Sequence, residues 1–557
     1  MASAPVTTAT TTSIAPSTTA STTTSSVRGQ RCVRLTPGAQ NVGTGEISAD
    51  ALHLSGETFV CADDVVVTSG ADLGELAIAA QLAAALTGPL LVEHPQLAAE
   101  VGRLKPRRVH LVGQVEVSAP PDSEIIRHDI ASAAAITAQT LETEEIQLLP
   151  EAPDAAVVIT SVQAVASGDR VALPRHVEPE PAPGTTDSTA VAGEAPVYDP
   201  AAVITALSTA NAAGSIWLVD AKSPTSILLA AAYAPHSDAA LVAIDPDDPL
   251  RYPQVSVALA GKPLEAMRRV GGLTEIDPWA LTVLANGVEL PGGGFRIVPA
   301  GQSRRYVAFY GHPETAALGA LGEQGPQETL LRMQPFLDAY AGDGAQVVPT
   351  FEMIAAVAAA GATEDNDYSF EWPVATFIPW IETARQNGAY VVLDLQSGRD
   401  DFLTQAQMYQ ELLAQPHVGL ALDPEWRLQP DQVHLRQTGS VTAAEANAVI
   451  DWVADLVRDN GLPQKMIIIH QFRHSMIRDR DTLKERPEIQ LVIQMDGEGG
   501  AGGEALKDRT YDALTAGTED KHWKWGWKNF FDEDEPGPPP PENVMRKDPV
   551  PVYVSYQ

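Results

Sequence analysis

"HVGLALDPEW", residues 417–426, is an apolar run that breaks into Asp423, Pro424, Glu425 and Trp426. A strand that is apolar throughout is typical of a parallel sheet covered on both faces. Similar runs recur along the C-terminal half at 306–312, 345–352, 389–396, 465–472, 489–497 and 522–528. Helical patterns lie between them, and the one at 442–461 opens with a capping box and stops at a glycine. Seven strand–helix units, with an eighth strand in 550–557, predict a (β/α)8-type (TIM-like) barrel, and a doubly wound sheet is the alternative.

Polar side chains gather at the carboxyl ends of these strands, where barrels of this type form their active sites. The carboxylates that we take as catalytic candidates are Glu352, Asp394, Asp423, Glu425 and Asp496. The candidates for substrate binding are Tyr310, His312, Trp426, His470, Arg473, Trp525 and Trp527. An Asp at a strand end also caps a following helix, which is the structural alternative for Asp394 and Asp496.

The strongest candidates are Asp423 and Glu425, because residues two apart in a strand point to the same side. Like charges that lie close together raise the pKa of one group, which can then act as a general acid while its neighbour stays ionised. Glycoside cleavage divides the work between two carboxyl groups in this way. The structural alternative has Asp423 capping the turn that begins at Pro424, and Glu425 pairing with Arg427.

The N-terminal half has a βαβ pattern, with strands at 64–70, 89–94 and 107–113 and helices at 72–88 and 95–104. The same order of elements returns in 214–246 and 267–276. We therefore expect an α/β fold in which Rossmann-like βαβ repeats precede the barrel. A nucleotide site would need a G-x-G-x-x-G turn after the first strand, and Gly70 and Gly74 lack that spacing. The expected domains are a Thr/Ser-rich segment at 1–30, a first repeat region at 31–177, a linker at 178–196, a second repeat at 197–302 and the barrel at 303–557.

Residues 63–118 resemble a cell-wall-binding type 2 repeat of Gram-positive surface proteins. The resemblance rests on an SG-x-D turn at 69–72, a "PLLV" strand at 89–92 and "LKP" at 104–106 leading to Gly113. It implies Rossmann-like modules that hold a protein non-covalently on anionic cell-wall polymers. The chain departs from the family in having two recognisable repeats instead of three, and Gly113-Gln114 where Gly-Gly is usual.

The Asp423–Glu425 stretch is similar to the D-x-E signature on the fourth strand of chitinase-like hydrolases and muramidase-type lysozymes. Val418 and Ala421 replace earlier acidic positions of the chitinase pattern, and the first strand lacks the Asp of the muramidase pattern. The segment 310–530 resembles an uncharacterised domain found beside wall-binding repeats in actinobacterial secreted proteins. These resemblances imply a surface protein with a glycosidase-like barrel.

The charge of the chain limits the classes of partner that it can bind. The 557 residues include 37 Lys and Arg and 72 Asp and Glu, which gives a formal net charge of −35. Such a chain is a poor match for nucleic acid or for an anionic membrane surface. No apolar run reaches the length of a membrane span. His470 and His474 are four apart but suggest no third ligand, so neither a metal nor a cofactor is expected.

The N-terminal tract is rich in Thr, Ser, Ala and Pro, without the basic and apolar regions of a signal peptide, and it is expected to be a disordered tether; a cytoplasmic linker is the alternative. Cys32 and Cys61 are the two cysteines, and they form either a disulfide in an oxidising compartment or two separate thiols. We therefore expect an extracellular, wall-associated protein whose barrel hydrolyses or binds a glycan. A non-catalytic surface binding protein is the alternative.

Overall fold

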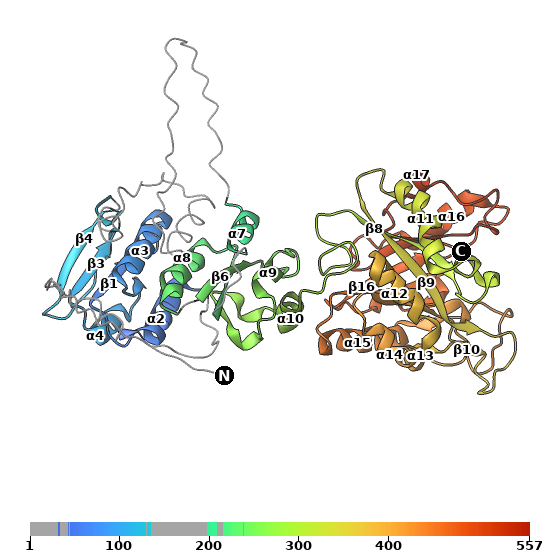
Figure 1. Ribbon diagram of the computed structural model, residues 1–557, viewed down its shortest axis with the longest axis horizontal. Helices are drawn as coiled ribbons and strands as arrows, with labels where there is room; N and C mark the ends of the chain where they lie inside the picture. Colours follow the sequence, from blue (N-terminus) through green and yellow to red (C-terminus); the bar gives the residue numbers. More distant parts are fainter. Residues whose placement is uncertain are drawn as a thin grey trace, which may run out of the picture.

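The computed structural model describes residues 32–33, 43, 45–129, 131–134, 137, 198–208, 215–237 and 239–557. The expected tether at 1–30 and linker at 178–196 lie outside the described residues. Two lobes are seen in Figure 1, one formed by the N-terminal half and one by the chain from β8 onward. The domain boundaries expected from the sequence stay predictions.

The C-terminal lobe is a closed barrel of eight parallel strands, in which the last strand pairs with the first. In barrel order the strands are β8 (Arg304–Gly311), β9 (Gln346–Ala358), β11 (Tyr390–Leu395), β12 (Val418–Leu422), β14 (Lys465–Gln471), β16 (Ile489–Met495), β17 (Lys524–Asn529) and β18 (Tyr553–Tyr556). Closure confirms the TIM-like barrel and excludes the doubly wound alternative. All eight apolar runs singled out in the sequence form barrel strands.

Helices of the barrel lobe connect most of these strands. They are α11 (Pro326–Tyr340), α12 (Ile378–Asn387), α13 (Phe402–Met408), α14 (Gln410–Leu413), α15 (Ala443–Asp459), α16 (Gly503–Thr515) and α17 (Pro541–Val544). Three short strands of this lobe lie outside the eight-stranded barrel. β10 (Ser369–Glu371) runs antiparallel to the end of β9, and β13 (Val441–Thr442) pairs with β15 (Ile477–Arg478). The Thr442 side chain accepts a hydrogen bond from the backbone N–H of Glu445, so α15 begins at the predicted cap.

Apolar side chains fill the part of the barrel interior that is farther from the carboxyl ends of the strands. Alternate residues of each strand point inward, and a separate buried cluster contains Tyr306, Ala308, Tyr390, Val392, Ala421, Met466, Ile468, Val492 and Tyr553. A Cβ on Gly419 would lie 3.0 Å from the Tyr390 hydroxyl oxygen and 2.7 Å from the Met466 carbonyl oxygen. Glycine is therefore needed where the tyrosine crosses the interior. The upper, carboxyl-end part of the interior is left for polar groups.

The N-terminal lobe holds two parallel sheets with the same central arrangement. In one, β1 (Asp64–Thr68) lies between β2 (Leu90–Val92) and β3 (Arg108–Val112), with β4 (Glu124–His128) beyond β3. In the other, β5 (Ser215–Asp220) lies between β6 (Ala239–Ile244) and β7 (Met267–Val270). The helices are α2 (Ile47–Thr58), α3 (Leu73–Leu86), α4 (Leu97–Leu104), α7 (Pro200–Leu207), α8 (Pro224–Tyr233), α9 (Val255–Leu259) and α10 (Pro278–Asn286). In both sheets the first strand along the chain thus lies between the second and the third.

Helices α3 and α8 pack against each other between the two sheets. Tyr233 at the end of α8 is fully buried, and its hydroxyl donates a 2.6 Å hydrogen bond to the carbonyl oxygen of Leu90 in the other sheet. Cys32 and Cys61 form a disulfide, which decides between the two alternatives for these residues. Among the helices of the described residues, none combines the length and the apolar character that crossing a membrane requires.

The two lobes meet at the face of the barrel opposite its carboxyl-end mouth. Trp279 and Asn286 of α10 donate hydrogen bonds of 3.0 Å each to the carbonyl oxygens of Leu462 and Gly461, in the loop that enters β14. Arg458, at the end of α15, forms an ion pair of 2.6 Å with Asp277. Loops that enter strands lie at the amino end of a parallel barrel, so these contacts of the described residues are made at the end of the barrel opposite the carboxyl-end mouth.

Candidate active site

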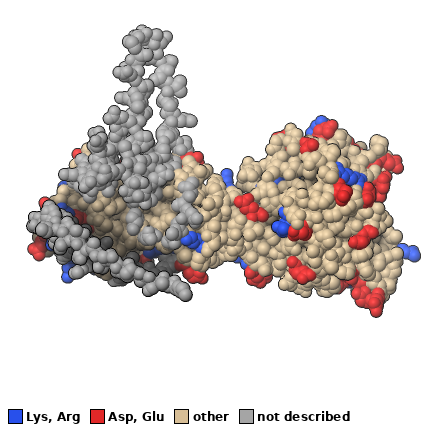
Figure 2. Space-filling model, in the orientation of Figure 1, with Lys and Arg blue, Asp and Glu red and all other residues tan. Residues whose placement is uncertain are grey.

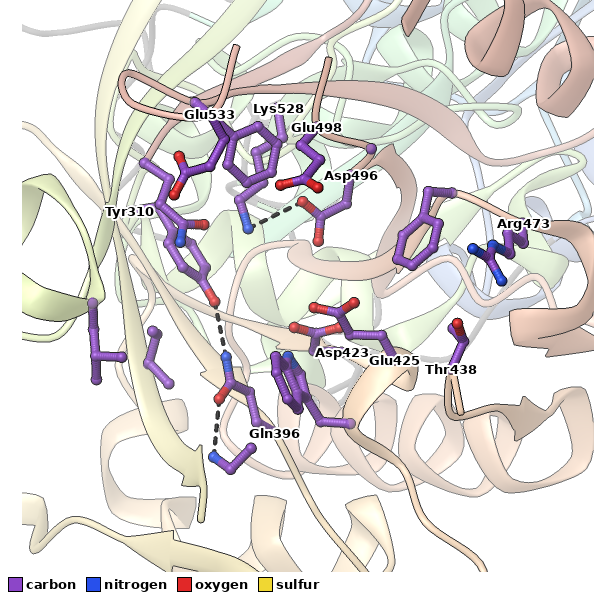
Figure 3. Close-up of a pocket in the computed structure, with 18 of the residues that line it drawn as sticks. Tyr310, Gln396, Asp423, Glu425, Thr438, Arg473, Asp496, Glu498, Lys528 and Glu533 are labelled. Carbon is purple, nitrogen blue, oxygen red and sulfur yellow. Dashed lines mark hydrogen bonds and ion pairs between the residues drawn. The ribbon is translucent and has the colours of Figure 1, made fainter. Parts of the chain in front are cut away.

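A cavity of about 720 Å³ opens at the carboxyl ends of the barrel strands (Figure 3). Among its lining residues are Tyr310, Gln396, Asp423, Glu425, Trp426, Arg473, Asp496, Glu498, Lys528, Phe530 and Glu533. The structure therefore brings together six of the candidates from the sequence: Tyr310, Asp423, Glu425, Trp426, Arg473 and Asp496. They come from the ends of different strands, as the fold requires of an active site.

His470 lies at the centre of a charged layer just beneath this cavity and is fully buried. Its Nε2 atom is 3.1 Å from Oε1 of Glu352, and its Nδ1 atom is 3.0 Å from Oδ2 of Asp496. Burial lowers the pKa of His470, but Asp496, Glu352 and Asp394 outweigh it and hold that pKa well above its ordinary value. His470 is therefore an imidazolium that bridges carboxylates, beneath the cavity instead of on its wall.

Glu352 and Asp394 are also fully buried below the cavity, and tyrosine hydroxyls hold them in place. Tyr553 donates a 3.0 Å hydrogen bond to Oε2 of Glu352, and Tyr310 donates one of 2.9 Å to Oδ2 of Asp394. Burial raises the pKa of Asp394 to about 6. Their place beneath the cavity suits residues that position the site better than residues that touch a substrate.

Lys528 ends β17 and reaches into the same layer. Its Nζ atom is 3.1 Å from Oδ1 of Asp496 and 3.7 Å from the centre of the Tyr310 ring. Burial raises the pKa of Asp496, but Lys528 and His470 outweigh it, so the net shift is downward. Asp496, which lines the cavity, is therefore held as a carboxylate by two cations.

Asp423 and Glu425 lie across the cavity from Asp496 (Figure 3). Burial raises the pKa of Asp423 well above its ordinary value, and the neighbouring Glu425 adds to the shift. Burial, with Asp496 adding to it, raises the pKa of Glu425 to about 7. One carboxyl oxygen of each of Asp423, Glu425 and Asp496 lies within 4.8 Å of the others. The surroundings thus favour the protonated forms of Asp423 and Glu425 and the ionised form of Asp496.

The structural alternative for this pair is wrong. Asp423 precedes the 3-10 turn η7 (Pro424–Trp426), yet its side chain makes no capping hydrogen bond there. Arg427 does not pair with Glu425, because its Nε donates a 2.8 Å hydrogen bond to Glu445 of α15. Within the described residues the Asp423 and Glu425 side chains have no hydrogen-bond or ion-pair partner, and Oδ1 of Asp423 is buried without one. Both carboxyl groups are free to meet a ligand.

The prediction that Asp423 and Glu425 lie on one strand is wrong, because β12 ends at Leu422. Asp423 follows the strand, whereas Glu425 belongs to the turn η7 and reaches the cavity from there. Both side chains therefore line the same cavity, as predicted, but Glu425 reaches it from a turn and not from the strand.

Three substrate-binding candidates lie away from the cavity, which corrects the prediction for them. Trp525 and Trp527 point outward from β17, where both are buried against the Tyr511 ring of α16. His312 is fully buried, with its ring 4.1 Å from that of Trp372, and burial lowers its pKa to about 4. Each of the three packs into the layer around the strands, which a strand-end position does not exclude.

The sequence assigns no role to Lys528, although alternation along β17 supplies the signal. In 524–529, Lys528 shares a face with Gly526 and is opposed to Trp525 and Trp527. A Cβ on Gly526 would lie 3.2 Å from the Gln494 side chain, which marks this face as the interior of the barrel. Glu498 and Glu533, also missed, follow the strands in loops, where no periodicity identifies them.

Two groups of carboxylates among the described residues have the spacing of metal ligands. One is Asp423, Glu425 and Asp496, and the other is Asp365, Asp367 and Glu371 on the β9–β10 hairpin. In the first group, Lys528 already provides the positive charge beside Asp496. Asp496 is therefore already paired with a cation of the protein itself.

No family model matches the chain, and no curated protein matches it. Among solved structures the chain is similar to Cwp6 from Clostridium difficile, with 11% sequence identity and a TM-score of 0.34. The similarity covers 65% of this chain and 63% of that one, so the chain spans less than two thirds of the length of the solved structure. A likeness at this TM-score carries no functional assignment.

Proposed function

We propose that the barrel hydrolyses a glycan at its mouth, with Glu425 as general acid and Asp496 as its ionised counterpart. The observation that carries the proposal is that Glu425 and Asp496 face one open cavity with their nearest oxygens 4.8 Å or less apart, in surroundings that raise the pKa of the first and lower that of the second. Two carboxyl groups whose surroundings push their pKa values apart are the usual acid–base assignment of a glycosidase.

In this mechanism Glu425 protonates the glycosidic oxygen of the leaving sugar. Asp496, which is kept ionised by the flanking Lys528 and His470, attacks the anomeric carbon as the glycosidic bond breaks. Glu425, now ionised, then takes a proton from a water molecule, which attacks the same carbon and releases the sugar from Asp496. The separation is nearer the roughly 5–5.5 Å between carboxyl groups of retaining enzymes than the longer spacing of inverting ones. We therefore infer retention of configuration, which the anomer released first would test.

Asp423 is proposed as the partner of Glu425. It is 1% exposed, and burial beside Glu425 favours its protonated form, which would limit the negative charge near the acid and offer a hydrogen bond to substrate. Trp426, Tyr310 and Phe530 supply aromatic surface on the cavity wall, of the kind on which sugar rings stack.

For the N-terminal lobe we propose wall attachment. The support is the shared strand order of its two sheets, which suits the Rossmann-like repeats of the wall-binding family that residues 63–118 resemble. The Cys32–Cys61 disulfide favours an oxidising, extracellular setting. Since this lobe meets the barrel opposite its mouth, attachment would leave the mouth open to substrate.

The test is Glu425→Gln in the full chain, incubated with purified cell-wall fractions while released reducing ends are counted. Because the acid is lost, we expect hydrolysis to fall by about 10²–10⁴-fold, with sedimentation of the protein on walls unchanged. Glu519→Gln, an exposed residue outside the cavity, is the matched control and should behave as the native protein. Undiminished hydrolysis by Glu425→Gln would refute the assignment, and wall binding by a native protein that releases nothing would favour the non-catalytic alternative.

A further inference from the structure

The cavity is acidic beyond what its proposed chemistry needs. Five carboxyl groups line it, namely Asp423, Glu425, Asp496, Glu498 and Glu533, against the two cations Arg473 and Lys528. Lys528 is committed to Asp496 at 3.1 Å. Hydrolysis uses Glu425 and Asp496, so Glu498 and Glu533 have no part in the bond-breaking step.

Glu498 and Glu533 are exposed side chains on the loops that follow β16 and β17. Figure 3 shows both on the side of the cavity that carries Asp496 and Lys528. Within the described residues neither carboxylate has a hydrogen-bond or ion-pair partner, whereas the neighbouring acids are engaged, as Asp534 and Asp496 illustrate. Their charge is therefore available to a ligand in the cavity.

Asp534 fixes the loops that carry them. Its Oδ1 accepts a 2.7 Å hydrogen bond from the backbone N–H of Gly499, and its Oδ2 accepts one of 2.6 Å from the buried Lys507. The backbone N–H of Gly500 also donates to the carbonyl oxygen of Glu533 at 3.0 Å. The two loops are thus tied together, which fixes the backbone from which Glu498 and Glu533 extend.

A second, independent observation lies deeper in the cavity. Asp423 is 1% exposed and lines the cavity wall, yet its Oδ1 atom has no hydrogen-bond partner. A buried oxygen without a partner costs free energy unless a ligand or water satisfies it. Asp423 therefore provides a hydrogen-bonding position that a polar group of the substrate would fill.

The charge of the whole chain acts in the same direction. The net charge of −35 adds to the local charge of the rim, so that at the cavity a cationic ligand is favoured over an anionic one. Acidic side chains are spread over the visible face of the barrel lobe (Figure 2). A neutral glycan would gain nothing from this field, and an anionic one would be disfavoured.

We propose that the barrel selects a glycan whose sugars carry free, protonated amino groups, such as a polymer of unacetylated hexosamine. Glu498 and Glu533 receive the ammonium groups at the rim, and Asp423 meets a polar group of the sugar placed at the reacting position. This specificity rests on the proposed glycosidase function and names its substrate class. An N-acetylated sugar lacks the charge that the rim carboxylates would pair with.

The test measures binding apart from hydrolysis. In the full chain carrying Glu425→Gln, which is close in shape and charge to the protonated acid, calorimetry compares a glucosamine hexamer with an N-acetylglucosamine hexamer. We expect the cationic hexamer to bind more tightly and to lose its advantage as salt is raised. Adding E498Q and E533Q should weaken the cationic hexamer by about fivefold, the size expected for two solvent-screened ion pairs, and leave the acetylated one unaffected.

The matched control adds E519Q and D520N to the same background. These residues are exposed in the loop that enters β17, at the opposite end of the barrel, so they remove the same charge outside the cavity. Equal or tighter binding of the acetylated hexamer, or equal losses in the rim and control variants, would overturn the specificity. Selective binding of the cationic hexamer with no cleavage of either hexamer by the native protein would uphold the specificity and refute the glycosidase instead.

Discussion

At the scale of single residues, the charges around Asp496 decide which acid of the cavity carries a proton. Glu425 has its pKa raised to about 7, whereas that of Asp496 is lowered. Glu425 must be protonated for the proposed step, so activity is lost as the pH rises through about 7. Asp496 must be ionised, so activity is also lost as the pH falls through a value below the ordinary aspartate range.

The first prediction is therefore a bell-shaped dependence of kcat/KM on pH, with its alkaline limb near pH 7. Initial rates of reducing-end release between pH 3 and 9 measure it. In Glu425→Asp, whose carboxyl group is shorter by one methylene, the alkaline limb should shift and the maximum fall. A rate that stays constant above pH 8 would contradict the role given to Glu425.

The second prediction concerns Lys528, which supports the ionised state of Asp496 from 3.1 Å. Lys528→Met keeps the side-chain length and removes the charge, so the pKa of Asp496 should rise. We expect the acid limb of the pH profile to move upward, with a lower maximum. Lys524→Met, on the same strand but outside the cavity lining, is the control. An acid limb that stays in place would show that Lys528 does not act through Asp496.

At the scale of elements, Trp527 and Trp426 both lie at or just after the end of a barrel strand, yet their surroundings differ. Trp527 is fully buried against Tyr511 of α16, whereas Trp426 of η7 is half-buried on the cavity wall. The first belongs to the packing between strand and helix, and the second can contact a sugar. The third and fourth predictions follow from this contrast.

Trp527→Ala should lower the free energy of unfolding by about 3–5 kcal/mol, because it leaves a cavity in the core. Urea denaturation followed by circular dichroism measures the loss. Trp426→Ala should leave the free energy of unfolding within about 0.5 kcal/mol of the native value, as expected of a partly exposed side chain. A stable Trp527→Ala variant would contradict its place in the packing.

Trp426→Ala should instead weaken glycan binding by about two- to tenfold, the effect of losing one aromatic contact. The measurement is calorimetry in the Glu425→Gln background, so that hydrolysis does not interfere. Phe370→Ala, an exposed aromatic residue outside the cavity lining, is the control and should bind as the parent does. Unchanged affinity in Trp426→Ala would remove Trp426 from the proposed binding surface.

At the scale of the whole molecule, each lobe has a stabilising feature of its own. The barrel closes on its own interior, whereas the N-terminal lobe has a disulfide between Cys32 and Cys61, 29 residues apart. The lobes touch at the amino end of the barrel, through α10 and the loop that enters β14. A change in the N-terminal lobe should therefore leave the mouth intact.

The fifth prediction is that replacing both cysteines by serine destabilises the N-terminal lobe by about 3–4 kcal/mol, as expected for a loop of this length. Hydrolysis of a soluble oligosaccharide should not change, whereas wall binding should be lost at lower denaturant concentration. Parallel urea titrations of wall binding and of hydrolysis measure the two lobes separately. A matching loss of hydrolysis would show that the lobes unfold as one unit.

Much of this fold is readable from the sequence. Buried parallel strands need apolar side chains on both faces, so runs such as 389–396 and 417–422 are recognisable as strands in the sequence. The helical patterns between them indicate that the strands are parallel. The carboxyl ends of such strands meet at one mouth, which is why the sequence predicts that Asp423 and Asp496 lie close together. These properties are local or follow from the order of elements along the chain.

Tertiary structure alone decided which polar strand ends line the cavity. Arg427 pairs with Glu445 and not with Glu425. His470 contacts both Glu352 and Asp496, which are 144 positions apart in the sequence. Whether Trp527 or Lys528 faces the interior depends on neighbouring strands that close the barrel, and Glu498 and Glu533 reach the rim through loops tied by Asp534. The free energy of these contacts comes from burial and charge pairing between distant segments, and a local pattern does not contain it.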